Sequence, residues 1–194
     1  MSDLVHTLTL DSLREILQQT GYRVETVTDP VANIPYLRSA TGGLGFDVRP
    51  GNRLAGQRLD DKNPGFADLA FVAVLQVQGE LSLDLVNRWN VGRRFARLQY
   101  SPPFLALSMD VSVAGGVGPG HLRAQIEIWD RLVQELIGYL RDELAKPGAV
   151  TAPGAVAAPG NAGAAMPAVA QEASQAAEPA RDPAPQAVPT ATIQ

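Results

Sequence analysis

Apolar and polar residues alternate most regularly between Leu105 and Val113. Every second residue from Leu105 is large and apolar, and the residues between them are small or polar. A period of two is typical of a β-strand that buries one face. The preceding run, Phe95–Tyr100, is separated from it by Ser101-Pro102-Pro103, which predicts a β-hairpin. The run Leu69–Leu75 contains no polar residue, so we expect a central strand buried on both faces.

The longest apolar pattern lies between Gly120 and about Ala145. Large apolar residues recur there at alternating spacings of four and three, which predicts a long amphipathic helix with a seam of Leu122, Ile126, Trp129, Val133, Leu136 and Leu140. Ile128, Leu132 and Ile137 lie beside this seam and widen it. We expect the seam to cover the domain's own sheet and the flank, with Leu132 and Ile137, to stay exposed for a second subunit.

Shorter patterns fill the rest of the domain. A helix is predicted from about Leu10 to Leu17, with Thr9 or Asp11 as its cap and Gly21 as its end. Residues 50–65 have the composition of a loop. Three further strands and one helix are predicted at Tyr22–Thr28, Ile34–Arg38, Leu44–Val48 and Ser82–Val91. Because strands and helices do not alternate strictly, the order predicts an α+β fold, with an antiparallel sheet packed against helices including the long C-terminal one.

The composition changes sharply at Lys146-Pro147. Residues 147–194 are mostly Ala and Pro and contain no Leu, Phe, Trp or Tyr. Such a segment has little to bury against a core, and its scattered prolines interrupt helix formation. We therefore expect one domain at residues 1–146 and a disordered tail at residues 147–194.

The formal net charge of −4 argues against nucleic acid or an anionic membrane surface as a partner. The chain has no cysteine and only two histidines, His6 and His121, so we expect no metal. The glycine-rich link Gly115–Gly120 lacks the Lys-Ser/Thr of a phosphate-binding loop, and no catalytic triad is visible. We expect a non-enzymatic protein without a cofactor. The N-terminus has no basic, apolar leader, which favours the cytoplasm.

Two groups of polar residues lie in or near the second predicted helix. Asn87, Trp89 and Asn90 form a cluster for which we expect a structural role, because amides near a helix end satisfy backbone groups. The second group is a basic patch of four arginines, Arg88, Arg93, Arg94 and Arg97. Guanidinium groups bind carboxylates and phosphates, so the patch could hold an anion or an acidic peptide, or pair with acids of the same chain.

Several segments together resemble those of the YbjN-domain family. They are the apolar strand, the run VNRWNVGRRFARLQY, the alternating strand ending Met109-Asp110-Val111, and the run AGGVGPGHLRAQIEIW that opens the long helix. The family is described as bacterial regulators of sensory transduction with a fold like type III secretion chaperones. The resemblance implies a chaperone-like α+β fold and dimerisation, and it supplies no catalytic residues. The loop at residues 50–65 is longer and more basic than the family's connection.

The residues and the resemblance together lead to one expectation and one alternative. We expect a protein-binding module with a chaperone-like or regulatory role, acting as a homodimer, whose contacts come from the basic patch, Leu132 and Ile137. The alternative is a domain that senses a small anion held by the arginines near residues 88–97. A flat apolar surface would favour the first, and a closed pocket lined by arginines would favour the second.

Overall fold

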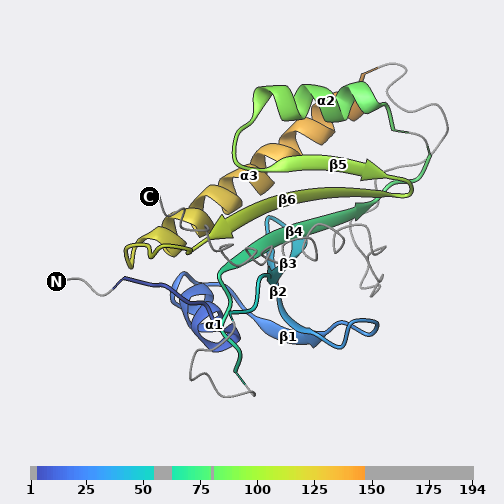
Figure 1. Cartoon of the computed structure of the whole chain (residues 1–194). Coiled ribbons are helices and arrows are strands. Elements are labelled where there is room, and N and C mark those ends of the chain that lie inside the picture. Colours follow the sequence, from blue (N-terminus) through green and yellow to red (C-terminus); the bar gives the residue numbers. More distant parts are fainter. Residues whose placement is uncertain (1–3, 55–62, 80, 147–194) are drawn as a thin grey trace, which may run out of the picture.

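The computed structural model describes residues 4–54, 63–79 and 81–146. The predicted tail at 147–194 and the middle of the predicted loop at 50–65 lie outside these residues. Within them, three helices and six strands follow one another in the order α1 (Leu10–Gln19), β1 (Glu25–Thr28), β2 (Pro35–Thr41), β3 (Leu44–Pro50), β4 (Asp68–Gln76), α2 (Leu83–Gly92), β5 (Arg97–Ser101), β6 (Phe104–Ser112) and α3 (His121–Leu144) (Figure 1).

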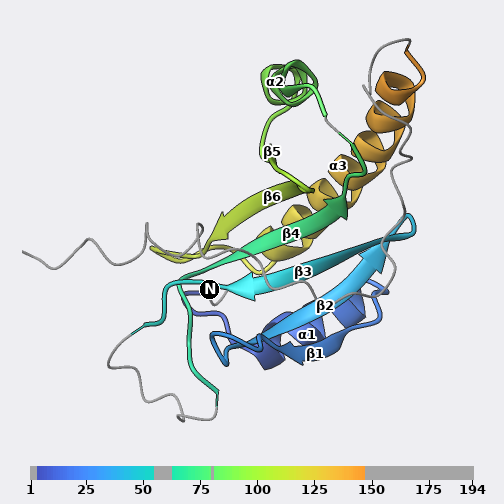
Figure 2. The ribbon, with the colours of Figure 1, turned by 90° about the vertical axis from the view of Figure 1, so that its right-hand side faces the viewer.

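The strands form a single antiparallel sheet in the order β1-β2-β3-β4-β6-β5. Helix α3 runs diagonally across one face of this sheet, and α1 lies near the β1 end, as Figures 1 and 2 show together. Helix α2 lies beyond the opposite edge, next to β5 and the C-terminal part of α3. This arrangement confirms the predicted α+β class with an antiparallel sheet.

The two long strands at the centre place one apolar face against the helices. In the register of β4 and β6, Phe71 lies opposite Met109 and Ala73 lies opposite Leu107, and all four are buried. The predicted alternation of the second strand and its hairpin with β5 are confirmed. The prediction that β4 is buried on both faces is wrong for Ala70 and Val74, which are only half-buried, because α3 covers one face of the sheet.

Helix α1 begins as the sequence predicts, but the first strand is shorter. The Thr9 hydroxyl accepts a hydrogen bond from the backbone N–H of Ser12, which completes a capping box. Pairing with β2 starts only at Glu25. Before it, Ser39 Oγ donates to the carbonyl of Arg23 at 2.8 Å, so a side chain replaces the strand ladder there. Residues 22–24 therefore approach the sheet without joining it.

Trp129 of α3 lies at the centre of the core. Its ring stacks on Phe71 with 5.4 Å between ring centroids and meets the edge of Phe46 at 5.7 Å. Tyr22 packs edge-on against Phe46 from the other side. These contacts join β3, β4 and α3, and they agree with the predicted role of Trp129 in covering the sheet.

The apolar flank of α3 is covered within the chain. Leu132 is only 4% exposed, so the prediction that it lies on a free surface is wrong. Leu132 and Tyr139 are one heptad apart and share a side of α3. Tyr139 packs against Trp89 of α2 at 5.4 Å and donates its hydroxyl hydrogen to the Leu85 carbonyl at 2.7 Å. Helix α2 therefore packs on the side of α3 where the sequence predicted a second subunit. Ile137 is half-buried against the core.

Candidate protein-contact surface on helix α2

Helix α2 has apolar residues on two opposite faces. Ser82 caps its N-terminus by accepting a hydrogen bond from the Asp84 N–H at 3.2 Å. One face, formed by Leu85, Val86 and Trp89, is buried against the core. The opposite face has a residue at every fourth position, so the three side chains lie in line along the helix. We call this line, formed by Leu83, Asn87 and Val91, the α2 stripe.

The α2 stripe is open to solvent. Leu83 is 63% exposed and Val91 is 90% exposed, and Asn87 between them is exposed as well. Phe95, just after the helix, is 59% exposed and has a backbone φ of 74°. A positive φ is strained for a bulky residue, so the chain holds an exposed aromatic ring at a local energetic cost. This surface was not among the sequence predictions, although the helical period places Leu83 and Val91 opposite Leu85 and Trp89.

Three neighbouring residues that the sequence groups together lie in different environments. Trp89 is fully buried, whereas Asn87 points to solvent on the α2 stripe. The Asn90 side chain accepts a hydrogen bond from the Leu98 N–H at 2.8 Å and donates to the Leu98 carbonyl at 2.9 Å. Its amide thereby pairs with the outer edge of β5 as a neighbouring strand would. Asn90 makes the backbone contacts that the sequence led us to expect of an amide in this cluster.

Two of the four patch arginines form short ion pairs with carboxylates of the chain. Arg88 reaches across to Glu143 of α3 with 2.6 Å between nitrogen and oxygen. Arg97 pairs with Asp110 on the neighbouring strand at 2.7 Å. The Asp110 side chain is 57% exposed, so this pair lies at the surface.

The other two patch arginines stack on aromatic rings. The Arg93 guanidinium lies 4.8 Å from the ring centroid of Trp89 and contacts Glu135 at 3.4 Å. The Arg94 guanidinium lies 5.5 Å from the ring centroid of Phe95 and has no carboxylate partner among the described residues. Arg88 and Arg93 both lie near Tyr139, whereas Arg94 and Arg97 have other partners, so the four guanidinium groups do not share one partner.

Glu143 is the buried carboxylate that sequence reasoning missed. Its pKa is lowered from the ordinary value by hydrogen bonds from Lys146 and Arg88, in that order of effect. The same contact with Glu143 raises the pKa of Arg88. The spacing of Glu143 after Tyr139 on α3 could have suggested that it faces α2, because residues four apart share a helix face.

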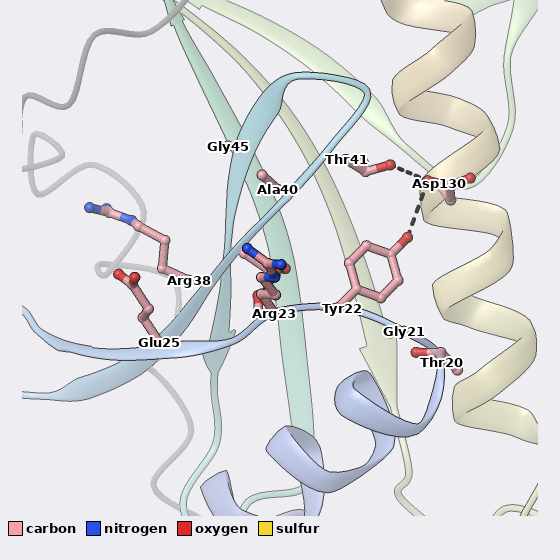
Figure 3. Close-up of a pocket in the computed structure, with 11 residues that line it drawn as sticks. Thr20, Gly21, Tyr22, Arg23, Glu25, Arg38, Ala40, Thr41, Gly45 and Asp130 are labelled. Atoms are coloured by element: carbon pink, nitrogen blue, oxygen red, sulfur yellow. Dashed lines mark hydrogen bonds between the residues drawn. The ribbon is translucent and has the colours of Figure 1, made fainter.

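The structure also has an open hollow of about 670 Å³ near the β1 end of the sheet (Figure 3). Tyr22 and Thr41 donate hydrogen bonds to the same carboxylate oxygen of Asp130 there. Burial and this carboxylate raise the pKa of Tyr22 to about 12. In Figure 3, Arg38 and Glu25 point away from this group, so the polar side chains around the hollow do not converge. The bonds to Asp130 connect the end of β2 and the segment before β1 to α3.

Neither a metal cluster nor a membrane span is found in the described part of the chain. No three His, Asp or Glu side chains are grouped there to hold an ion. None of the described helices combines the length and the apolar content that crossing a membrane requires.

These observations define an α+β domain with an exposed apolar stripe on a peripheral helix. The comparison with family models matches residues 9–141 to YbjN, described as "Putative bacterial sensory transduction regulator". The match covers well over half of the chain, and the chain therefore belongs to the YbjN family. Neither the comparison with curated proteins nor the comparison with solved structures found a match.

Proposed function

We propose that this domain is a non-enzymatic regulatory module of the cytoplasm that acts by binding another polypeptide through the α2 stripe and Phe95. The exposed line of Leu83 and Val91 directly opposite the buried face of α2 carries this proposal. A short helix of a soluble domain normally exposes polar residues on its outer face. Apolar residues in line there, beside a strained and exposed Phe95, are typical of a surface that another protein covers.

The family description is consistent with this role. A regulator of sensory transduction and a chaperone-like module would both act by binding other proteins. The proposal adds a location on the molecule that the family description lacks. It also replaces the expected contact through Leu132, since that side chain is buried.

The alternative of a small-anion sensor has less support. An anion held by Arg88, Arg93 or Arg97 would have to displace Glu143, Glu135 or Asp110 from that arginine, which leaves Arg94 as the one patch arginine without a carboxylate partner in the described residues. The guanidinium groups also have different main partners, Glu143, Glu135, Asp110 and the Phe95 ring, whereas an anion site needs donors that converge on one ligand. An apolar stripe recognises a polypeptide far better than it recognises a small anion.

Site-specific photo-crosslinking in the native cell tests the proposal. A photoreactive residue at position 91 should give a discrete crosslinked product, because Val91 lies in the middle of the proposed contact. The matched control is position 31, since Val31 is 81% exposed but lies in the turn between β1 and β2. Absence of a product at 91, or equal products at 91 and 31, would contradict the proposed function.

A further inference from the structure

We infer that the polypeptide bound at the α2 stripe is an amphipathic helix of another protein, which packs antiparallel to α2 and has an acidic residue in its first turn and a basic residue in its last. This inference rests on the proposed function, because it assumes that the stripe is a protein contact. It goes further by naming the secondary structure, the direction and the charge pattern of the partner segment.

The stripe offers a partner side chains only. Beyond the first turn of a helix, each backbone N–H is paired with the carbonyl four residues before it. The stripe spans about 12 Å along the axis of α2, from Leu83 to Val91. An extended segment on this line would cover part of its own unpaired N–H and C=O groups with apolar side chains, which is costly. A helix pairs its own backbone groups, so a helix is the segment that fits.

The spacing of the stripe also matches a helix. Leu83, Asn87 and Val91 are four residues apart, and rows of side chains at this spacing are the ridges that pack into the grooves of a second helix. Asn87 is exposed, and its side chain has no hydrogen bond to a described residue. An apolar residue opposite Asn87 would leave its amide buried without a partner. The partner helix therefore needs a polar residue there, between two apolar ones, and this requirement fixes the register.

The C-terminal end of the stripe has an unpaired positive charge. The Arg94 guanidinium stacks on the exposed ring of Phe95, with 5.5 Å to the ring centroid. It forms no ion pair with a carboxylate in the described part of the chain. Stacking uses the face of the guanidinium and leaves the N–H groups at its edge free to bind a carboxylate. An acidic residue beside the apolar face of the partner fits this end.

The N-terminal end of the stripe has an unpaired negative charge. Asp84 is exposed, lies in the first turn of α2, and has no ion pair within the described ranges. Successive residues of a helix are about 100° apart, so Asp84 lies on the flank of the stripe and away from the buried face. A basic residue of the partner fits this end.

The two charges set the direction of the partner helix. The helix dipole favours acidic residues in the first turn of a helix and basic residues in the last. When such a helix runs antiparallel to α2, its first turn lies next to Arg94 and its last turn lies next to Asp84. Both ends are then complementary, whereas a parallel helix would place acid beside acid and base beside base. The surface therefore favours the antiparallel direction.

The size of the surface sets the expected strength. A helix of 10 residues is about 15 Å long. Even with Phe95, such a face buries less than the roughly 800 Å² per partner of a standard stable interface. We therefore expect reversible binding with a dissociation constant in the micromolar range.

A synthetic peptide probe tests whether the stripe binds such a helix. The probe is an alanine-rich helix, blocked at both ends, with Leu, Asn and Leu four residues apart, Glu in its first turn and Lys in its last. Fluorescence anisotropy with the full chain should show micromolar binding, and Val91→Glu should weaken it by at least about tenfold. Val31→Glu is the matched control, because Val31 is comparably exposed elsewhere, and it should leave binding unchanged. Absence of binding to the wild type up to about 1 mM would overturn the inference.

A double-mutant cycle between probe and protein tests the direction. Arg94→Gln should weaken binding of the Glu probe by about threefold and leave binding of a probe with Gln in place of Glu unchanged. Asp84→Asn should affect both probes equally, because the first turn of the probe lies at the other end of α2. Equal effects of Arg94→Gln on the two probes, or coupling of the probe Glu to Asp84, would contradict the antiparallel direction.

The crosslinking experiment separates this inference from the proposed function. A product with another protein at position 91, together with no binding of the probe, overturns the helical partner and leaves the proposed function standing. A product with the mass of two copies of the chain also overturns the inference, because the bound polypeptide is then the chain itself. Without any product at position 91 the proposed function fails, even where the probe binds.

Discussion

Helices α2 and α3 differ in how their apolar residues are covered. Helix α3 is 24 residues long, and both its seam and the flank with Leu132 are buried within the chain. Helix α2 is 10 residues long and buries one face, but it also exposes Leu83 and Val91 on the other. The longer helix has more apolar residues, yet the shorter one has the free apolar surface.

This difference shows that the width of an apolar pattern does not identify the surface left for a partner. A wide pattern on α3 reflects two neighbours of the same chain, the sheet and α2. The narrow outer line on α2 is exposed to solvent among the described residues. Exposure depends on where the other elements lie, and those positions are set by contacts between residues that are distant in the sequence.

The largest expected effect comes from truncating the buried flank of α3. Leu132→Ala should lower the free energy of unfolding by about 2–5 kcal/mol, because it leaves a cavity between α3 and its neighbours. Val91→Ala on α2 is the comparison and should change the free energy of unfolding of the monomer very little, since Val91 is 90% exposed. Chemical denaturation at low protein concentration measures both values. Equal decreases in the free energy of unfolding for the two variants would contradict the difference in burial between Leu132 and Val91.

The two asparagines of α2 allow a bonded and an exposed side chain to be compared within one helix. Asn90→Ala should cost about 1–3 kcal/mol of unfolding free energy, because the Leu98 N–H and carbonyl lose their partner. Asn87→Ala should cost far less, since Asn87 is exposed and its side chain has no hydrogen bond to a described residue. Thermal or chemical unfolding of the two variants at low protein concentration gives the test. If Asn90→Ala leaves the free energy of unfolding unchanged, the hydrogen bonds from Asn90 to the edge of β5 do not contribute to stability.

The contact between α2 and α3 should also make stability depend on pH. The pKa of Glu143 is lowered in the folded state by Lys146 and Arg88. Its contribution to stability is therefore fully present above the ordinary pKa of 4.5 and is lost as the pH falls through the lowered value. Glu143→Gln should flatten the loss of stability in this acidic range. Denaturation curves measured from neutral pH downwards would show the same slope in both proteins if the contact contributes nothing.

The elements of the fold were largely predictable because their signals are local. The alternation from Leu105 to Val113 and the Thr9 cap are visible within a few residues of sequence. The contact of Trp89 in α2 with Tyr139 in α3 was not predictable, because it depends on how two helices separated by a hairpin pack together. The positive φ of Phe95 has no sequence signature, since such a conformation is normally reserved for glycine.

The smallest expected effect is at Arg97, the patch arginine that lies on the sheet rather than on or beside α2. Its ion pair with Asp110 has side chains 55% and 57% exposed, so solvent screens the attraction. A double-mutant cycle with Arg97→Ala and Asp110→Ala should give a coupling below about 1 kcal/mol. The Arg88 and Glu143 pair is the internal comparison, because Glu143 is buried between α2 and α3 while Asp110 is not. A coupling at Arg97 larger than at Arg88 would mean that the basic patch acts as a connected network after all, and it would revive the anion-binding alternative at the expense of a contact centred on α2.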